Sequence, residues 1–223
     1  ETYFQVAEYR KPEFQVSVTL DKGDYVQGDK IRALVEASYF FGGPVQGAIV
    51  QWRVMRAPYY FDRWQGEGWY SFQDFPDEPP YDFGGFVTEG TGKTDSLGQF
   101  TFEVPADISQ QKQSQLYTIE ASVIDVNNQE VSARAGAPIH KGTFYIGLRS
   151  DQYIGTVGQK LAVQAFTVDT QGLTRTQQAL TVTFYKQEWY SVKEKAADGS
   201  ENYYWTNKIR QTAVATQTIK TDA

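Results

Sequence analysis

The sequence predicts an all-β protein made of two tandem antiparallel β-sandwiches, and three observations lead to this prediction. Short segments that alternate apolar and polar residues follow one another, separated by turns that contain Gly, Pro or Asn. The second part of the chain repeats the order of strands and turns of the first. Aromatic residues make up 15% of the 223 residues, and their flat side chains suit a pleated sheet.

The first sandwich is predicted over residues 10–137. Alternating segments occupy residues 14–20, 31–39, 48–54, 100–104, 117–123 and 131–135. A turn is expected at 40–44, and the Asn residues within 125–129 predict a hairpin because Asn tolerates a positive φ. About seven short strands in roughly 125 residues are typical of an immunoglobulin- or fibronectin-like sandwich.

The second sandwich is predicted over residues 143–223. Its matching segments are Phe144–Leu148 for Phe14–Val18, Leu161–Thr167 for Ile31–Tyr39, and Leu180–Phe184 for the strand that contains Trp52. The Gly- and Pro-containing stretch suggests a linker at residues 138–142.

The repeat also predicts that the second sandwich is truncated. In the first copy Lys93–Asp95 precedes three more strands, whereas only one residue follows Lys220–Asp222. We therefore expect the second sandwich to lack its last strands. Residues 1–9 alternate like the tail of an upstream domain or a linker strand.

Each copy contains an aromatic-rich insertion between its middle strands, at residues 57–92 and Lys186–Asn207. One interpretation is that each insertion folds back as a long hairpin or cap over its own sandwich. The other is that it forms a contact surface between domains or subunits, where Trp and Tyr are enriched. The candidate interface aromatics are Trp64, Trp69, Trp189 and Trp205.

The residues indicate no catalytic, metal or cofactor site. Without Cys, disulfides and thiolate metal sites are excluded, and a single His excludes a multi-histidine metal site. That residue, His140, falls in the predicted linker, where an exposed side chain is expected. The carboxylates at 74, 77, 78 and 82 fit no calcium-loop spacing and predict a solvated acidic loop.

Residues 90–94 (GTGKT) resemble the end of a phosphate-binding loop. The full pattern requires Gly at the position of Val87, and it requires a helix where residues 99–104 predict a strand. We therefore interpret GTGKT as a turn that enters a strand.

Charge and hydropathy exclude further classes of partner. A net charge of −6 and a pI near 4.9 argue against nucleic acid and anionic membrane surfaces as partners. No apolar run reaches the length of a membrane span, so direct membrane insertion is not expected.

Several segments together resemble the third and fourth macroglobulin-like domains of bacterial α2-macroglobulins. They are Val6–Phe14, Gly28, Tyr39–Val45, Gly47–Ala48 and Thr94–Gly98 in the first copy, and Tyr153, Gly158 and Glu188–Trp189 in the second. In this resemblance, Glu8, Tyr9, Pro12 and Phe14 form the junction that opens the third domain.

The resemblance implies a function. Proteins of this family trap proteases: a protease cuts a bait segment, the molecule collapses around it, and in many members a thioester Cys captures it. With no Cys, this chain would be a non-catalytic scaffold fragment of such an endopeptidase inhibitor. Its partners would be neighbouring domains and, through the parent protein, target proteases.

The resemblance also implies an exported protein, which would be secreted, displayed on the cell surface, or periplasmic with or without a lipid anchor. A different function remains open, because tandem sandwiches with exposed aromatics also occur in adhesive and carbohydrate-binding proteins. An exposed coplanar row of Trp64, Trp69 or Trp205 would favour that alternative, and burial of these rings against neighbouring domains would favour the scaffold.

Overall fold

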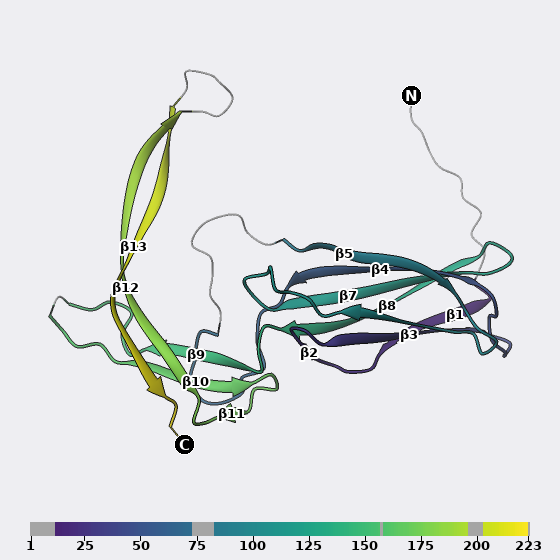
Figure 1. Ribbon diagram of the computed structural model, residues 1–223, viewed down its shortest axis with the longest axis horizontal. Coiled ribbons are helices and arrows are strands. Elements are labelled where there is room, and N and C mark those ends of the chain that lie inside the picture. The colour runs from purple at the N-terminus through teal and green to yellow at the C-terminus, as the bar shows by residue number, and fades with distance from the viewer. Residues whose placement is uncertain (1–11, 73–82, 157, 196–202, 223) are drawn as a thin grey trace. The chain divides into compact units, whose positions relative to one another are not determined.

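The computed structural model describes residues 12–72, 83–156, 158–195 and 203–222 (Figure 1). Within these residues the chain forms thirteen strands and no helix, which confirms the all-β prediction. The chain divides into two compact units, Glu1–Tyr145 with Asp169–Leu173, and Ile146–Val168 with Thr174–Ala223. Each unit is described separately below.

Two sheets form the first unit. The three-stranded sheet is antiparallel and has the order β1 (Phe14–Leu20), β3 (Lys30–Tyr39), β6 (Gln99–Pro105). The five-stranded sheet has the order β2 (Tyr25–Val26), β8 (Glu130–His140), β7 (Gln115–Ile124), β4 (Ile49–Pro58), β5 (Gly85–Lys93). All neighbours in it are antiparallel except the short pair β2–β8.

The core of the first unit lies between these sheets, because successive side chains of a strand point to opposite faces. Every second residue of β3 and β7 is buried, which matches the alternation read from the sequence. Trp52 of β4 and Phe102 of β6 come from different sheets, and their rings stack with centroids 4.2 Å apart. The predicted sandwich is therefore present, with an aromatic stack linking its two layers.

The glycines of GTGKT belong to strand β5. A Cβ on Gly90 would overlap the ring of Trp52, and a Cβ on Gly92 would overlap the ring of Phe100. Glycine in a strand often marks such a close approach. The expected turn is thus wrong in conformation, since these residues are extended. The missing side chains leave room for core aromatics, and the segment does not cradle a phosphate.

Aspartates organise three tight turns in the first unit. In each, one carboxylate oxygen accepts hydrogen bonds from the backbone N–H groups two and four residues later, at 2.8–2.9 Å, with Asp95, Asp125 and Asp169 as the acceptors. Asn128 has φ = 59°, as predicted for the hairpin between β7 and β8. The three turns share an Asp side chain that takes the place of a backbone acceptor.

The end of the first unit differs from the sequence expectation. Strand β8 continues through Pro138 and Ile139 to His140, where a linker was expected, and β9 begins at Phe144. Residues 137–140 are buried, so the prediction of an exposed His140 is wrong. Paired backbone explains the difference, because Ile139 lies opposite both Gln115 of β7 and Tyr25 of β2.

The second unit also contains two sheets. One has the order β11 (Thr174–Arg175), β10 (Val163–Asp169), β9 (Phe144–Ser150). The other consists of the two long antiparallel strands β12 (Ala179–Lys195) and β13 (Tyr203–Lys220), visible in green and yellow in Figure 1. Their pairing runs from Ala179 opposite Lys220 to Lys195 opposite Tyr203, with one irregularity at Phe184/Tyr185.

The two aromatic insertions fold differently. In the first copy, β4 extends to Pro58 and β5 begins at Gly85, so the insertion is shorter than the expected 57–92. In the second copy, the described part of Lys186–Asn207 belongs to β12 and β13, which agrees with the long-hairpin interpretation. Glu8, Tyr9 and the carboxylates at 74, 77, 78 and 82 lie outside the described residues.

Candidate functional site

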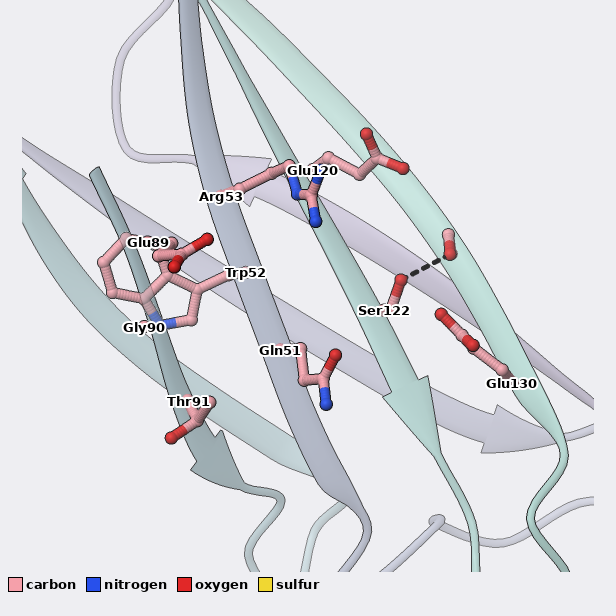
Figure 2. A pocket seen from close by; sticks show the side chains of 10 residues that line it. Gln51, Trp52, Arg53, Glu89, Gly90, Thr91, Glu120, Ser122 and Glu130 are labelled. Carbon is pink, nitrogen blue, oxygen red and sulfur yellow. Dashed lines mark hydrogen bonds between the residues drawn. The ribbon is translucent and has the colours of Figure 1, made fainter. Parts of the chain in front are cut away.

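A polar hollow of about 500 Å³ lies on the outer face of the five-stranded sheet (Figure 2). Its centre is Arg53 of β4, which the strand register places opposite Glu89 of β5 and Glu120 of β7. The lining residues are Gln51, Trp52, Arg53, Glu89, Gly90, Thr91, Glu120, Ser122, Glu130 and Ser132. All four longer strands of the sheet contribute to it.

Cross-strand contacts hold side chains of this hollow. Ser122 Oγ and Ser132 Oγ are 2.6 Å apart across β7 and β8, and Glu120 Oε2 lies 3.3 Å from Nε of Arg134, which is outside the lining. The chain's one imidazole is elsewhere, so neither serine has a histidine as general base. In the described part of the chain, no group of three His, Cys, Asp or Glu could hold a metal ion. This arrangement fits a solvated sheet face.

A second polar cluster surrounds His140 inside the first unit. His140 is fully buried, and its Nε2 lies 3.3 Å from Asp24 Oδ1 while its Nδ1 lies 2.6 Å from Tyr145 Oη. The guanidinium of Arg63 donates to both carboxylate oxygens of Asp24, at 2.8 and 2.9 Å. Gln171 donates a further hydrogen bond to Asp24 at 2.7 Å. We call these five residues the His140 cluster.

Hydrogen bonding fixes the direction of each proton in the cluster. The carboxylate of Asp24 can only accept, so Nε2 of His140 carries the proton and Nδ1 accepts from the Tyr145 hydroxyl. Tyr145 Oη in turn lies 2.8 Å from Ser114 Oγ, which accepts the backbone N–H of Lys141 at 3.1 Å. Both ring nitrogens of His140 therefore have a hydrogen-bond partner when the imidazole is neutral.

The titration properties of the cluster agree with this arrangement. Burial lowers the pKa of His140, although the hydrogen bond with Asp24 opposes the shift. Burial tends to raise the pKa of Asp24, but hydrogen bonds from Arg63, Gln171 and His140 outweigh it and hold that pKa below its ordinary value. Burial raises the pKa of Tyr145 to about 12. At neutral pH the cluster therefore contains a neutral His beside an Asp–Arg ion pair.

The cluster has the residue types of a catalytic relay but not its access. His140 is completely covered, and Ser114 is only 4% exposed although it lines a small pocket of about 190 Å³. A general base must lie within hydrogen-bonding distance of the proton that it removes from substrate. The cluster instead links three parts of the first unit by hydrogen bonds. These are the residue before β2 (Asp24), the 59–72 segment (Arg63) and the end of β8 (His140).

The aromatic side chains of residues 59–72 cap this same region. Phe61 is 5% exposed and stacks on Tyr145, with ring centroids 4.2 Å apart. Phe72 packs on Phe61 at 5.1 Å, and Trp64 lies 6.4 Å from Phe72. These contacts support the cap interpretation for this part of the first insertion, including Trp64.

The other three candidate aromatics are largely exposed. Trp69 is 77% exposed, Trp189 is 67% exposed and Trp205 is 70% exposed. Trp189 and Trp205 belong to β12 and β13 of the second unit, whereas Trp69 belongs to the first insertion. The four candidates are thus divided between the two units, and their role at an interface stays a prediction.

Pro12 and Phe14, the two junction residues that the structure describes, differ in their surroundings. Phe14 is fully buried and contacts Tyr39 edge to face, with ring centroids 6.2 Å apart. Pro12 lines a shallow depression with Glu13, Phe40 and Phe41, and the two phenylalanines are 62% and 80% exposed. Phe14 thus anchors the first strand in the core, and Pro12 stands at its surface.

Sequence reasoning missed the His140 cluster. Asp24 and His140 are 116 residues apart, and Asp24 and Arg63 are 39 apart, so no local motif connects them. The one available signal was a lone His beside an apolar Ala137–Ile139 segment.

Comparison with known proteins shows which proteins this chain resembles in sequence. The family model for macroglobulin domain MG3 matches residues 8–113. The α2-macroglobulin of Thermotoga maritima is 28% identical over 171 residues, which cover 76% of this chain and 10% of the relative. The α2-macroglobulin homolog of Nostoc sp. is 24% identical over 209 residues, covering 89% of this chain and 10% of the relative.

Solved structures give the same fold. The native conformation of Escherichia coli α2-macroglobulin has a TM-score of 0.65 and 15% identity, covering 98% of this chain and 14% of that one. Salmonella α2-macroglobulin reacted with methylamine has a TM-score of 0.65 and 14% identity, covering 99% of this chain and 15% of that one. The chain spans about a tenth of the length of the curated relatives it matches. Residues 8–113 therefore form a macroglobulin-like domain, and the chain is similar in sequence and fold to bacterial α2-macroglobulins.

Proposed function

We propose that this chain is a non-catalytic scaffold fragment of a bacterial α2-macroglobulin-type endopeptidase inhibitor. The observation that carries the proposal is the match of residues 8–113 to macroglobulin domain MG3, together with two relatives that are α2-macroglobulins. Two features of the described residues support the proposal: the serines of the polar hollow have no histidine beside them, and His140 is fully buried. Residues 143–223 would then be a second macroglobulin-like domain, of the fourth type.

The physical contribution of the fragment would be rigidity. The first unit has two sheets locked by the Trp52–Phe102 stack and, at one end, by the buried His140 cluster. Such a body can transmit a displacement between neighbouring domains because a close-packed core deforms little. Its partners would be those domains and, through the parent protein, the trapped protease. The parent would be exported, to the periplasm, the cell surface or the medium.

Acidity and hydropathy support the partner assignment. The net charge of −6 disfavours nucleic acid as a ligand. Among the described residues there is no helix long and apolar enough to cross a membrane.

The proposal is tested with the full-length polypeptide that contains these 223 residues. After incubation with trypsin or elastase, it should suppress cleavage of a large protein substrate and leave cleavage of a small chromogenic peptide intact. The 223-residue chain alone should suppress neither reaction. If trypsin or elastase treated with the full-length protein cleaves the large substrate as fast as the untreated protease, the proposal is overturned.

A second candidate function is an adhesive or carbohydrate-binding module. The observation that favours it is the exposure of Trp189 and Trp205 on one hairpin, since exposed rings can stack on sugars. Binding of the 223-residue chain to immobilised oligosaccharides, lost in Trp189→Ser, would support this candidate over the scaffold.

A further inference from the structure

A small pocket of about 190 Å³ lies within the first unit and shares no residue with the polar hollow of Figure 2. Five of its lining residues are aromatic: Tyr59, Tyr60, Phe61, Phe72 and Tyr145. The remaining ones are Lys112, Gln113 and Ser114, just before β7, and Lys141, just after β8. Three separate stretches of the chain therefore meet at this pocket. We call it the aromatic pocket.

Packing and hydrogen bonds hold the walls of the aromatic pocket in place. Phe61 is almost fully buried, and its ring stacks on Tyr145 at 4.2 Å and packs on Phe72 at 5.1 Å. The backbone N–H of Tyr59 donates to Ser114 O at 2.9 Å, which ties the 59–72 segment to the start of β7. A ligand would thus meet rings that are already ordered, and this lowers the entropic cost of binding.

The hydroxyl groups of Ser114 and Tyr145 have no proton left for a ligand. Tyr145 Oη donates to Nδ1 of His140 at 2.6 Å, so it accepts the proton of Ser114 Oγ, which lies 2.8 Å away. Ser114 Oγ in turn accepts the backbone N–H of Lys141 at 3.1 Å. An apolar group can cover both hydroxyls without leaving a donor unpaired. This part of the pocket therefore suits an aromatic ring.

The charged residues of the lining are both cationic. They are Lys112 and Lys141, and no Asp or Glu is among the described residues that line the pocket, although the whole chain has a net charge of −6. Lys141 Nζ donates to Gln111 O at 2.8 Å and to Ile108 O at 3.3 Å, and its third N–H remains available. Lys112 is exposed and has no ion-pair partner in the part of the chain that the structure describes. The lining therefore favours an anion.

One carboxylate outside the lining acts on Lys141 without neutralising it. The pKa of Asp107 is lowered to about 2, first by the hydrogen bond from the backbone N–H of Ser109 and only to a small extent by Lys141. Asp107 Oδ1 also accepts from Gln27 Nε2 at 3.1 Å. Lys141 forms no ion pair with Asp107 or with any other described carboxylate. Its positive charge is therefore available to a ligand.

The volume of the pocket limits the size of the ligand. A cavity of about 150 Å³ accommodates benzene. Drug-sized ligands occupy pockets of about 300–1,000 Å³. The 190 Å³ of the aromatic pocket thus provide room for one six-membered ring and a few further atoms.

We propose that the aromatic pocket binds a carboxylate that carries a single aromatic ring. The ring contacts the walls formed by Phe61, Phe72 and Tyr145, and the carboxylate pairs with Lys112 and Lys141. A free aromatic acid and the C-terminal Phe of a peptide present the same two groups. A neutral aromatic compound would leave the lysines unused, and a simple inorganic anion would leave the rings uncovered. The inference is independent of the proposed function, because every lining residue belongs to the first unit.

Fluorine NMR of para-fluorophenylacetate, titrated with the 223-residue chain, tests the proposal. We expect line broadening with a dissociation constant on the order of 1 mM, since a ligand of this size gains little energy per atom. The neutral para-fluorophenylacetamide should bind about three- to fivefold more weakly, because it lacks the charge that pairs with the exposed lysine. Acetate, which has the charge but no ring, should not displace the fluorinated acid at tenfold excess.

Two matched variants locate the binding site. Lys112→Gln should weaken binding of the acid about threefold and leave binding of the amide unchanged. Lys93→Gln removes an equally exposed charge from β5, outside the pocket, and should leave both unchanged. Tyr60→Ala removes part of the aromatic wall, so it should weaken the acid and the amide alike. Its ring is 49% exposed, so the core is not opened by this substitution.

Competition distinguishes the two sources of the ligand. If acetyl-Gly-Gly-Phe with a free carboxylate displaces the fluorinated acid and its C-terminal amide does not, the pocket takes the end of a peptide. If only unmodified phenylacetate displaces it, the pocket takes a free acid; either result supports the proposal. Equal affinity for the acid and the amide, or equal effects of Lys112→Gln and Lys93→Gln, would overturn it. So would the absence of broadening at concentrations about tenfold above the expected dissociation constant.

Discussion

The β3–β4–β7 region of the first unit and the β12–β13 hairpin of the second are built from similar strands with different surroundings. Both show alternating residues and long antiparallel pairing. In the first unit, Val50, Ile119 and Val35 are fully buried between two sheets. In the hairpin, large side chains at comparable positions, such as Trp189, stay exposed. Strand pairing alone therefore does not make a core, because burial needs a second layer.

The difference assigns separate roles to the two regions. A strand buried on one face draws its stability from contacts inside its own unit, since apolar burial is the main favourable term in folding. The hairpin places its apolar area where another body can reach it. The first region can act as a rigid element by itself, whereas the hairpin has only two strands in its sheet.

Truncation of a core aromatic should break the first region most severely. Phe102→Ala removes the ring that stacks on Trp52, and we expect a loss of about 3–5 kcal/mol in the free energy of unfolding. Trp189→Ala, the corresponding truncation on the hairpin, should change it by less than about 0.5 kcal/mol in the 223-residue chain. Urea denaturation followed by circular dichroism measures both. Comparable losses would show that the hairpin has a core of its own.

Removal of a buried hydroxyl should have the next largest effect. Thr94 Oγ1 donates to Val45 O at 2.6 Å and accepts the N–H of Ala48 at 2.9 Å, and the side chain is 4% exposed. Thr94→Val leaves both backbone groups unpaired, which should cost about 1–3 kcal/mol in a urea titration.

The matched substitution in the hairpin is Thr183→Val. Its hydroxyl shares one exposed cross-strand hydrogen bond of 3.2 Å with Thr216. We expect a change below about 0.5 kcal/mol, because water replaces the lost partner. A cost equal to that of Thr94→Val would contradict the contrast between the regions.

Acid should destabilise the two regions over different pH ranges. Burial lowers the pKa of His140 below its ordinary value of 6.5, so the folded first unit binds fewer protons than the unfolded chain below that pH. Its stability should be complete above pH 6.5 and fall as the pH drops below this value. A further loss should begin below pH 3.8, where Asp24, whose pKa is lowered on folding, becomes protonated in the unfolded chain.

The control for this effect is His140→Asn. In this variant the free energy of unfolding of the first unit should change less between pH 7 and 5 than in the unsubstituted chain. The chain has a single His, so no hairpin residue contributes there. The hairpin should respond only at lower pH, because Glu188 and Glu194 have pKa values lowered from 4.5 by their lysine partners. Urea midpoints measured at several pH values test this, and an unaltered slope in the variant would refute the role of His140.

The smallest effect is expected for an exposed ion pair on the hairpin. Lys208→Ala removes the partner of Glu194, and both side chains are partly exposed. We expect a small loss of stability that disappears in 1 M salt. Hydrogen exchange of the β12–β13 amides is a suitable readout. A large, salt-resistant loss would indicate that this face is buried.

Local patterns explain which features could be predicted from the sequence. The alternation in 31–39 and 117–123 reflects one buried face, so it identified β3 and β7 and their core residues. Asn128 and the Asp125 turn were predictable because turn chemistry involves only neighbouring residues. The resemblance to macroglobulin-like domains also rested on such local segments, and residues 8–113 match domain MG3.

Features that depend on distant contacts could not be predicted in the same way. The exposure of His140 was predicted wrongly because Pro138 and the neighbouring glycines suggested a linker, whereas β7 and β2 pair with this segment. Its partners Asp24 and Tyr145 lie on other elements. The extended conformation of Gly90 and Gly92 depends on the rings of Trp52 and Phe100 packing over them. The domain limits and the four interface tryptophans remain predictions.

The most direct test of this contrast is hydrogen–deuterium exchange of the 223-residue chain, resolved by peptide. The account predicts slow exchange in β3, β4 and β7, where amides open only with the core, and fast exchange in residues 185–195 and 203–213. Exchange of the outer hairpin as slow as that of β7 would contradict the claim that strand pairing without a second layer does not make a core.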